Sequence, residues 1–150
     1  MRTEVQFSVF MVNKPGVLAR VLGEFAQAKI NIIAMTLADS VEQGVMRIVT
    51  AAPEQAREVM KRLNMPFRET QVLCVNLSNQ PGALADVAEK LAKHHINIAY
   101  AYCTAGTRGG RTTGVLKVAD VEKAVKILQA RMDRSSKSGP TVRRSPASRR

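Results

Sequence analysis

The amino-acid sequence predicts an α+β fold of two tandem βαββαβ units, with antiparallel sheets and helices on one face. Three observations lead to this prediction. A motif recurs at a constant offset, the hydrophobic period within each repeat switches between that of a strand and that of a helix, and the composition allows an aliphatic core. Of the 150 residues, 45% are hydrophobic, but only 4% are aromatic and none is Trp. The core is therefore expected to consist of Val, Leu, Ile, Ala and Met.

The repeat is visible where two segments align without a gap. Asn-Lys-Pro-Gly-Val-Leu-Ala at residues 13–19 matches Asn-Gln-Pro-Gly-Ala-Leu-Ala at residues 79–85. The alignment continues to Ile-Asn-Ile at 30–32 and at 96–98. Because self-similarity at a fixed period indicates a duplicated structural unit, the chain contains two copies of one unit.

Each element of the first copy follows from its hydrophobic period. Alternating apolar and polar residues predict strands, and apolar residues at i, i+3, i+4 and i+7 predict an amphipathic helix. A proline is favoured in the first turn of a helix. We therefore expect a strand over 5–11, a helix that starts at Pro15 and is broken by Asn31, strands over 33–37 and 45–50, and a helix that starts at Pro53 and ends at 64–66.

The second copy repeats this plan. Its expected strands span 72–77, 98–104 and 113–118, and its expected helices span 83–94 and 121–132. The sequence leaves the fourth strand of the first copy open, because residues 68–72 either supply it or begin the first strand of the second copy. The predicted domains are 1–68 and 69–132, followed by a basic tail over 133–150.

The tail carries more than half of the net charge of +11, since residues 134–150 include six basic residues and no acidic one. It has almost no apolar side chains, so burial cannot offset its ordering entropy and we expect it to be disordered.

The sequence has no run of about 18 apolar residues, so it predicts no membrane-spanning helix. The sequence shows no signal-peptide core, and Cys74 and Cys103 fit no ligand spacing, so we expect a cytoplasmic protein with reduced cysteines.

The recurring Asn-x-Pro-Gly-x-Leu-Ala motif, followed by a helix and Ile-Asn-Ile, resembles the ACT domain over residues 3–132. ACT domains are ferredoxin-like regulatory modules attached to, or associated with, enzymes of amino-acid metabolism. The resemblance implies amino-acid binding at an interface between ACT units, near the first strand–helix turn and the start of the second strand. The implied ligand-binding residues are Asn13, Gly16 and Asn31 in the first copy, and Asn79, Gly82 and Asn97 in the second.

The chemistry of these positions agrees with amino-acid binding. A helix N-terminus offers unpaired N–H groups to a carboxylate, glycine allows close approach to the backbone, and an asparagine amide both donates and accepts hydrogen bonds. The alternative is that the Pro-Gly turns only start helices and that Asn31 and Asn97 only end them. Lys14 is replaced by Gln80 in the second copy, which favours the first copy if only one of them binds.

No catalytic set, cofactor motif or metal-ligand spacing is recognised, so we expect no enzyme activity, no cofactor and no metal. His94 and His95 are adjacent and point about 100° apart, so they cannot share a metal as an i, i+4 pair can. Residues 106–111 predict a solvated hairpin loop; the alternative is a flap whose two arginines contact an anionic ligand or partner.

The predicted function is regulatory binding of a small-molecule amino acid. We expect a homodimer, because units of this size with bare strand edges need an interface. The alternative is a ligand-independent regulatory subunit of a partner enzyme in amino-acid biosynthesis. Nucleic-acid binding, through the basic tail or through Tyr100 and Tyr102 on one strand face, is less favoured, and no membrane contact is expected.

Overall fold

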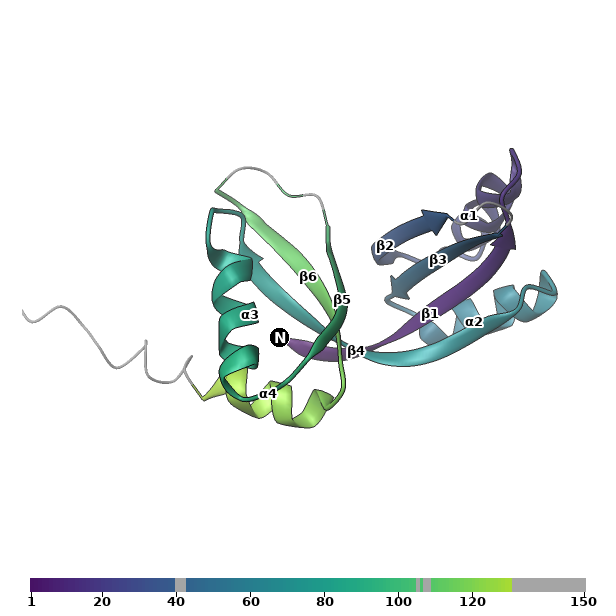
Figure 1. Ribbon diagram of the computed structural model, residues 1–150. Coiled ribbons are helices and arrows are strands. Elements are labelled where there is room, and N and C mark those ends of the chain that lie inside the picture. The colour runs from purple at the N-terminus through teal and green to yellow at the C-terminus, as the bar shows by residue number, and fades with distance from the viewer. Residues whose placement is uncertain (40–42, 105, 107–108, 131–150) are drawn as a thin grey trace, which may run out of the picture.

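The computed structural model describes residues 1–39, 43–104, 106 and 109–130. Its elements are β1 Arg2–Val12, α1 Val17–Gln27, β2 Ile32–Asp39, β3 Gln43–Thr50, α2 Pro53–Arg62, β4 Phe67–Ser78, α3 Ala83–Lys93, β5 Ile98–Cys103, β6 Arg111–Val118 and α4 Val121–Gln129. Within these residues the strands form one six-stranded sheet in the order β2-β3-β1-β4-β6-β5, and every neighbouring pair is antiparallel. The predicted α+β fold is confirmed, with the sheets of the two copies joined edge to edge (Figure 1). The predicted disordered tail lies outside the described residues.

Each copy completes its part of the sheet with a strand from the other. The first residues of β4 pair with β1, with Phe67 opposite Val9, and form the fourth strand of the first copy. The N-terminal end of β1 pairs with the second copy in the same way, with Arg2 opposite Cys74. β4 runs without interruption through 68–72, so the segment that the sequence left open serves both copies. The predicted boundary between residues 68 and 69 falls inside this strand.

Two hydrophobic clusters lie between the helices and one face of the sheet. Phe7, Phe25 and Met60 are fully buried in the first cluster, and Leu73 and Leu116 are almost fully buried in the second. Side chains on a strand alternate between faces, so the register decides whether the two clusters share a face. Val9 of the first cluster lies opposite Phe67 on β4, and Leu73 of the second cluster follows Phe67 on the same strand at an even spacing. An even spacing keeps side chains on one face, so all four helices cover the same face of the sheet, as predicted.

The helix-free face curls so that side chains of β5, at one edge of the sheet, reach β1 and β3. In a flat sheet β1 and β5 would lie three strand spacings, or about 14 Å, apart. Nevertheless the side-chain amide of Gln6 on β1 donates to the hydroxyl of Tyr100 on β5 at 2.7 Å and accepts from the hydroxyl of Tyr102 at 2.9 Å. The guanidinium of Arg47 on β3 lies 4.3 Å from the centre of the Tyr100 ring. These contacts join the two copies across the concave face.

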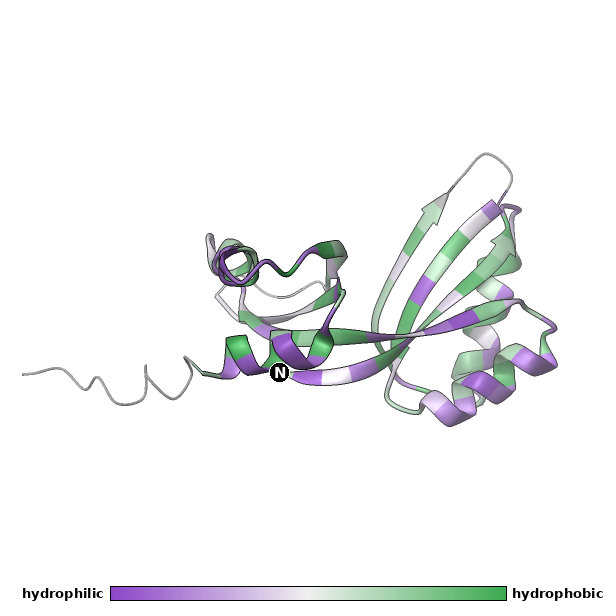
Figure 2. Ribbon diagram, turned by 60° about the horizontal axis from the view of Figure 1, so that its bottom comes forward, coloured by the Kyte–Doolittle hydropathy of each residue, from purple (hydrophilic) through white to green (hydrophobic). Residues whose placement is uncertain are grey.

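An apolar cluster lies beside this polar network. It comprises Ala34, Val49, Val72, Cys74 and Val115, from the four strands β2, β3, β4 and β6. Burial raises the pKa of the Cys74 thiol to about 11. Figure 2 shows how hydrophobic and hydrophilic residues are distributed along the strands. On β4 the alternation is interrupted at residues 72–75, which are buried in succession, so this central strand has apolar side chains on both faces.

An ion pair fastens the shared strand to the first copy. The Arg57 guanidinium on α2 donates to both carboxylate oxygens of Glu69 on β4, the second at 3.1 Å. These hydrogen bonds hold the pKa of Glu69 below its usual range.

Left-handed residues end the first helix of each copy earlier than the sequence predicts. α1 begins at Val17, after Pro15, and ends at Gln27; Lys29 then adopts φ 56°. In the second copy α3 ends at Lys93 and His95 adopts φ 57°. The prediction that Asn31 breaks the first helix is therefore wrong, because the chain has already turned two residues before it.

Candidate ligand-binding site

A glycine in the left-handed conformation precedes each of the two matching helices. Gly16 has φ 88° before α1 and Gly82 has φ 89° before α3, and neither helix has a side-chain cap at its N-terminus. A Cβ at either position would meet no atom within 4 Å, so these glycines are required by their backbone angle and not by crowding. The first-turn N–H groups of both helices are thus left without a side-chain acceptor, which favours an anion nearby.

The two asparagines that begin the motif differ in their surroundings. Asn79 donates from its side-chain amide to the carbonyl of Gly106 at 2.9 Å, and its backbone N–H donates to the carbonyl of Gly110 at 2.8 Å. It therefore ties the β5–β6 hairpin to the strand–helix turn. Asn13 is exposed and borders a cavity of only about 50 Å³.

The other two asparagines lie at the opposite ends of their units. The carbonyl of Asn31 accepts a hydrogen bond from Ala51, beyond the end of β3, whereas Asn13 follows Val12, which is opposite Gln43 at the start of that strand. At about 3.3 Å per residue, the length of β3 separates them by roughly 25 Å. The register of β6 separates Asn97 from the second turn in the same way. One chain therefore does not bring the six predicted residues together.

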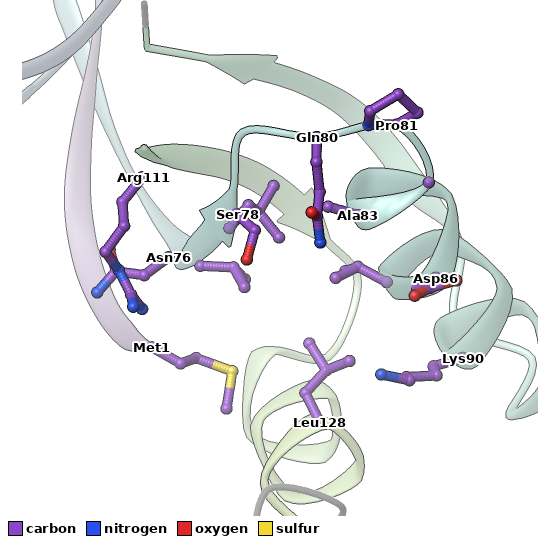
Figure 3. A pocket seen from close by; sticks show the side chains of 14 residues that line it. Met1, Asn76, Ser78, Gln80, Pro81, Ala83, Asp86, Lys90, Arg111 and Leu128 are labelled. Atoms are coloured by element: carbon purple, nitrogen blue, oxygen red, sulfur yellow. The ribbon is translucent and has the colours of Figure 1, made fainter. Parts of the chain in front are cut away.

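A cavity of about 580 Å³ opens beside the second strand–helix turn. Strand β4, helices α3 and α4, the start of β6 and Met1 surround it (Figure 3). Its polar and charged lining is Asn76, Ser78, Gln80, Asp86, Lys90 and Arg111, and its apolar lining includes Met1, Val75, Leu77, Val87 and Leu128. Of the predicted residues, Gly82 lines it. Met1 precedes β1 and the rest of the lining belongs to the second copy, so the start of the first copy's chain borders a cavity of the second copy.

Three charged side chains face one another across this cavity without pairing. Arg111 lies on one side, and Asp86 and Lys90 on α3 lie on the other (Figure 3). No salt bridge joins any two of the three in the described structure. The arrangement can bind a carboxylate through the cations and an ammonium through the Asp86 carboxylate.

The corresponding space in the first copy is smaller and its charges are satisfied differently. It has a volume of about 260 Å³ and is bordered by Leu63, Met65 and Pro66, which connect α2 to β4. At the repeat offset, Arg20 takes the place of Asp86, and Glu24 the place of Lys90. Glu24 is paired with Arg62 of α2 at 3.3 Å. Of these two cavities, the one in the second copy is the larger. It therefore favours binding in the second copy, whereas Lys14 in the motif of the first copy favoured binding there.

Comparison with protein families decides the identity of the repeat. Residues 2–134 match the ACT domain pair family. The chain belongs to this ACT family. Membership supports a ligand-binding regulatory role, and it favours a protein without catalysis of its own, since ACT domains are regulatory modules.

Solved structures share the fold of this chain. Protein BT0572 from Bacteroides thetaiotaomicron is 27% identical, with a TM-score of 0.80 over 87% of this chain and 89% of its own. The ligand-free regulatory subunit of aspartate kinase from Thermus thermophilus is 14% identical, with a TM-score of 0.63 over 87% of this chain and 97% of its own. The corresponding subunit from Thermus flavus is 15% identical, with a TM-score of 0.57 over 87% and 91%. No curated protein matches the chain.

The cavity of the second ACT copy is lined by charged residues that sequence reasoning did not assign to a site. Asp86 and Lys90 stand at i and i+4 on α3, but on an amphipathic helix such a pair is usually a solvated surface pair. Arg111 was singled out only as one of the two arginines in 106–111. Arg108, the other, lies outside the described residues. Met1 gave no signal, because its place depends on the pairing of β1 with the second ACT copy.

The described residues of this ACT chain can also be compared with three other kinds of site: a surface that stacks bases, a metal site and a membrane-spanning helix. Tyr100 and Tyr102 have their hydroxyls bonded to Gln6, and Arg47 covers the Tyr100 ring, so they do not form an open platform for bases. Among the described residues, no group of three or more His, Cys, Asp or Glu side chains is placed to hold a metal ion. None of the helices described is long and apolar enough to cross a membrane.

Proposed function

We propose that this protein is a regulatory amino-acid sensor, in which a ligand at the interface between the ACT copies changes their packing and so alters a partner. The observation that carries the proposal is the cavity of about 580 Å³ beside the second strand–helix turn. It combines the uncapped N-terminus of α3, cations for a carboxylate and the Asp86 carboxylate for an ammonium. Pockets with an apolar lining and a few convergent polar groups are typical ligand sites.

Both ACT copies contribute to this site, which gives a route from ligand to response. Met1 lines the cavity and packs against the second hydrophobic cluster, and β1 continues from it to the first strand–helix turn. A ligand that shifts Met1 thus acts on a strand that both copies share. Regulation follows if the ligand binds one packing of the two copies better than another.

A thermal-shift screen of the purified protein against the twenty amino acids tests the proposal. A ligand at one hundred times its Kd stabilises the folded state by about 2.7 kcal/mol. Arg111→Met should remove the shift, whereas Arg20→Met in the smaller cavity of the first copy should retain it. If no amino acid stabilises the wild type, the sensor proposal is wrong and the ligand-independent regulatory subunit takes its place.

The sheet edge at β2 supports the proposed homodimer. β2 has a partner on one side only, and its apolar side chains Met35 and Leu37 are 36% and 46% exposed. A second chain paired at a sheet edge would also bring Asn31 or Asn97 to a strand–helix turn that its own chain cannot reach. Leu37→Lys should shift the protein towards monomer in sedimentation velocity, and an unchanged distribution would place the dimer interface elsewhere.

The fold relatives support a proposal for the kind of partner. Two of the similar structures are regulatory subunits of aspartate kinase, so a partner enzyme of amino-acid metabolism is the working proposal for this chain. Capture of such an enzyme by the immobilised protein, with and without the amino acid found in the screen, tests it. A complex that ignores the ligand would favour the interaction subunit over the sensor.

A further inference from the structure

The charges around the second-copy cavity identify the class of ligand. Among the described residues, two cations, Arg111 and Lys90, and one anion, Asp86, line it, so these side chains carry a net charge of +1. We propose that the cavity selects a dicarboxylic α-amino acid, a ligand with two carboxylates and one ammonium. This proposal rests on the proposed function, because it assumes that an amino acid is bound there.

The positions of the three groups fit such a ligand. Arg111 and Lys90 extend from opposite sides of the cavity, so each is able to bind a different carboxylate (Figure 3). Asp86 lies one helical turn before Lys90 on α3, so its carboxylate is available to the ammonium of the ligand. The aliphatic lining side chains, such as Leu77, Val87 and Leu128, suit the methylene groups between the carboxylates.

The three groups also lack internal partners. A charge that faces a cavity without a counter-ion is stabilised when a ligand supplies one, and charge-assisted hydrogen bonds are the stronger ones. An amino acid with a neutral side chain would leave one cation unpaired. A dicarboxylate without an amino group would leave Asp86 unpaired. A ligand with all three groups pairs each of the three charged side chains described around the cavity.

The first copy gives an internal comparison. Its equivalent of Lys90 is Glu24, which already has Arg62 as a partner at 3.3 Å. In the second copy the residue that follows α4 at the place of Arg62 is Ala130, and among the described residues Lys90 forms no ion pair. Arg20, in the place of Asp86, would repel an ammonium. We therefore expect one ligand per chain.

Isothermal titration calorimetry of the full chain with four ligands tests the proposal. Glutamate should bind about tenfold or more tightly than glutamine, 2-oxoglutarate or leucine, with one site per chain. Lys90→Met should abolish the preference for glutamate over glutamine. Asp86→Asn should abolish the preference for glutamate over 2-oxoglutarate. Lys93→Met, an exposed change on the same helix outside the cavity, should change neither.

The outcomes separate this inference from the sensor proposal. If leucine or glutamine binds as tightly as glutamate, or if two ligands bind per chain, the charge argument is wrong and the sensor proposal stands. If aspartate, glutamate and every other amino acid fail to bind, the sensor proposal itself is wrong. If each variant keeps the wild-type selectivity while binding persists, the ligand lies outside this cavity and the proposal is overturned.

Discussion

Loss of the Gln6 amide should weaken the contact that joins the two copies across the concave face. Gln6 is fully buried and makes two short hydrogen bonds, to Tyr100 at 2.7 Å and from Tyr102 at 2.9 Å. A buried hydrogen bond contributes about 1 kcal/mol net, so the two together contribute about 2 kcal/mol. Gln6→Ala also leaves a cavity, and we expect a total loss of about 3 kcal/mol in the free energy of unfolding.

A double-mutant cycle separates the hydrogen bond from the packing. Gln6→Leu keeps the volume of the side chain, and Tyr102→Phe removes only the hydroxyl that donates to it. Since Tyr102 is half-buried, its freed hydroxyl can reach water, and we expect each single change to cost about 1–2 kcal/mol. The coupling energy from urea unfolding, followed by circular dichroism, should be about 1 kcal/mol. A coupling below about 0.3 kcal/mol would refute the argument that this bond joins the copies.

Three further predictions follow from single residues. Gly82→Ala should lower the free energy of unfolding by about 1 kcal/mol, because residue 82 has a left-handed backbone. Gly23→Ala, in mid-helix with open space where its Cβ would lie, should raise the free energy of unfolding by about 0.5–1 kcal/mol in the same urea assay. Equal effects of the two changes would contradict this reasoning. Under native conditions a thiol reagent at pH 8 should modify the exposed Cys103 rapidly and the buried Cys74 only after unfolding, and two fast thiols would show that the concave face is open. The ion pair of Glu69 lowers the pKa of its carboxyl in the folded state, so its stabilisation is present above about pH 4.3 and is lost as the pH falls through the folded pKa. Glu69→Gln should therefore flatten the acid limb of the stability–pH profile, and an unchanged limb would show that other carboxyls dominate it.

The sequence was sufficient for the elements and their faces, because these depend on local periods. The apolar spacing of α1 buries Val21 and Phe25, and the alternation along β1 buries Phe7 and Val9 as predicted. The sharing of strands between the two copies could not be predicted from the sequence. Whether residues 68–72 belong to one copy or both depends on which distant strand lies opposite, and period alone carries no such register.

In the candidate site, too, some features could be predicted from the sequence and others depend on how the elements pack. The Pro-Gly turns were found from the motif, and the left-handed Gly82 lines the cavity. Neither Asp86 nor Arg111 could be assigned, because they meet only after β4, α3 and β6 have packed. The different volumes of the two cavities also depend on packing, since Met65 and Pro66 fill part of the space in the first copy.

The exchange of strands has a consequence for how this protein is made. During synthesis the N-terminal end of β1 leaves the ribosome before β4, and its partner residues, Gln71–Cys74, are translated only after the whole first copy. Until then Arg2–Val5 is an unpaired edge of the kind that invites pairing with another chain. Neighbouring nascent chains on one message would be at risk of swapping this strand, and contacts so distant in sequence also slow folding. The chain therefore gains its native second copy only once translation has passed the end of the repeat.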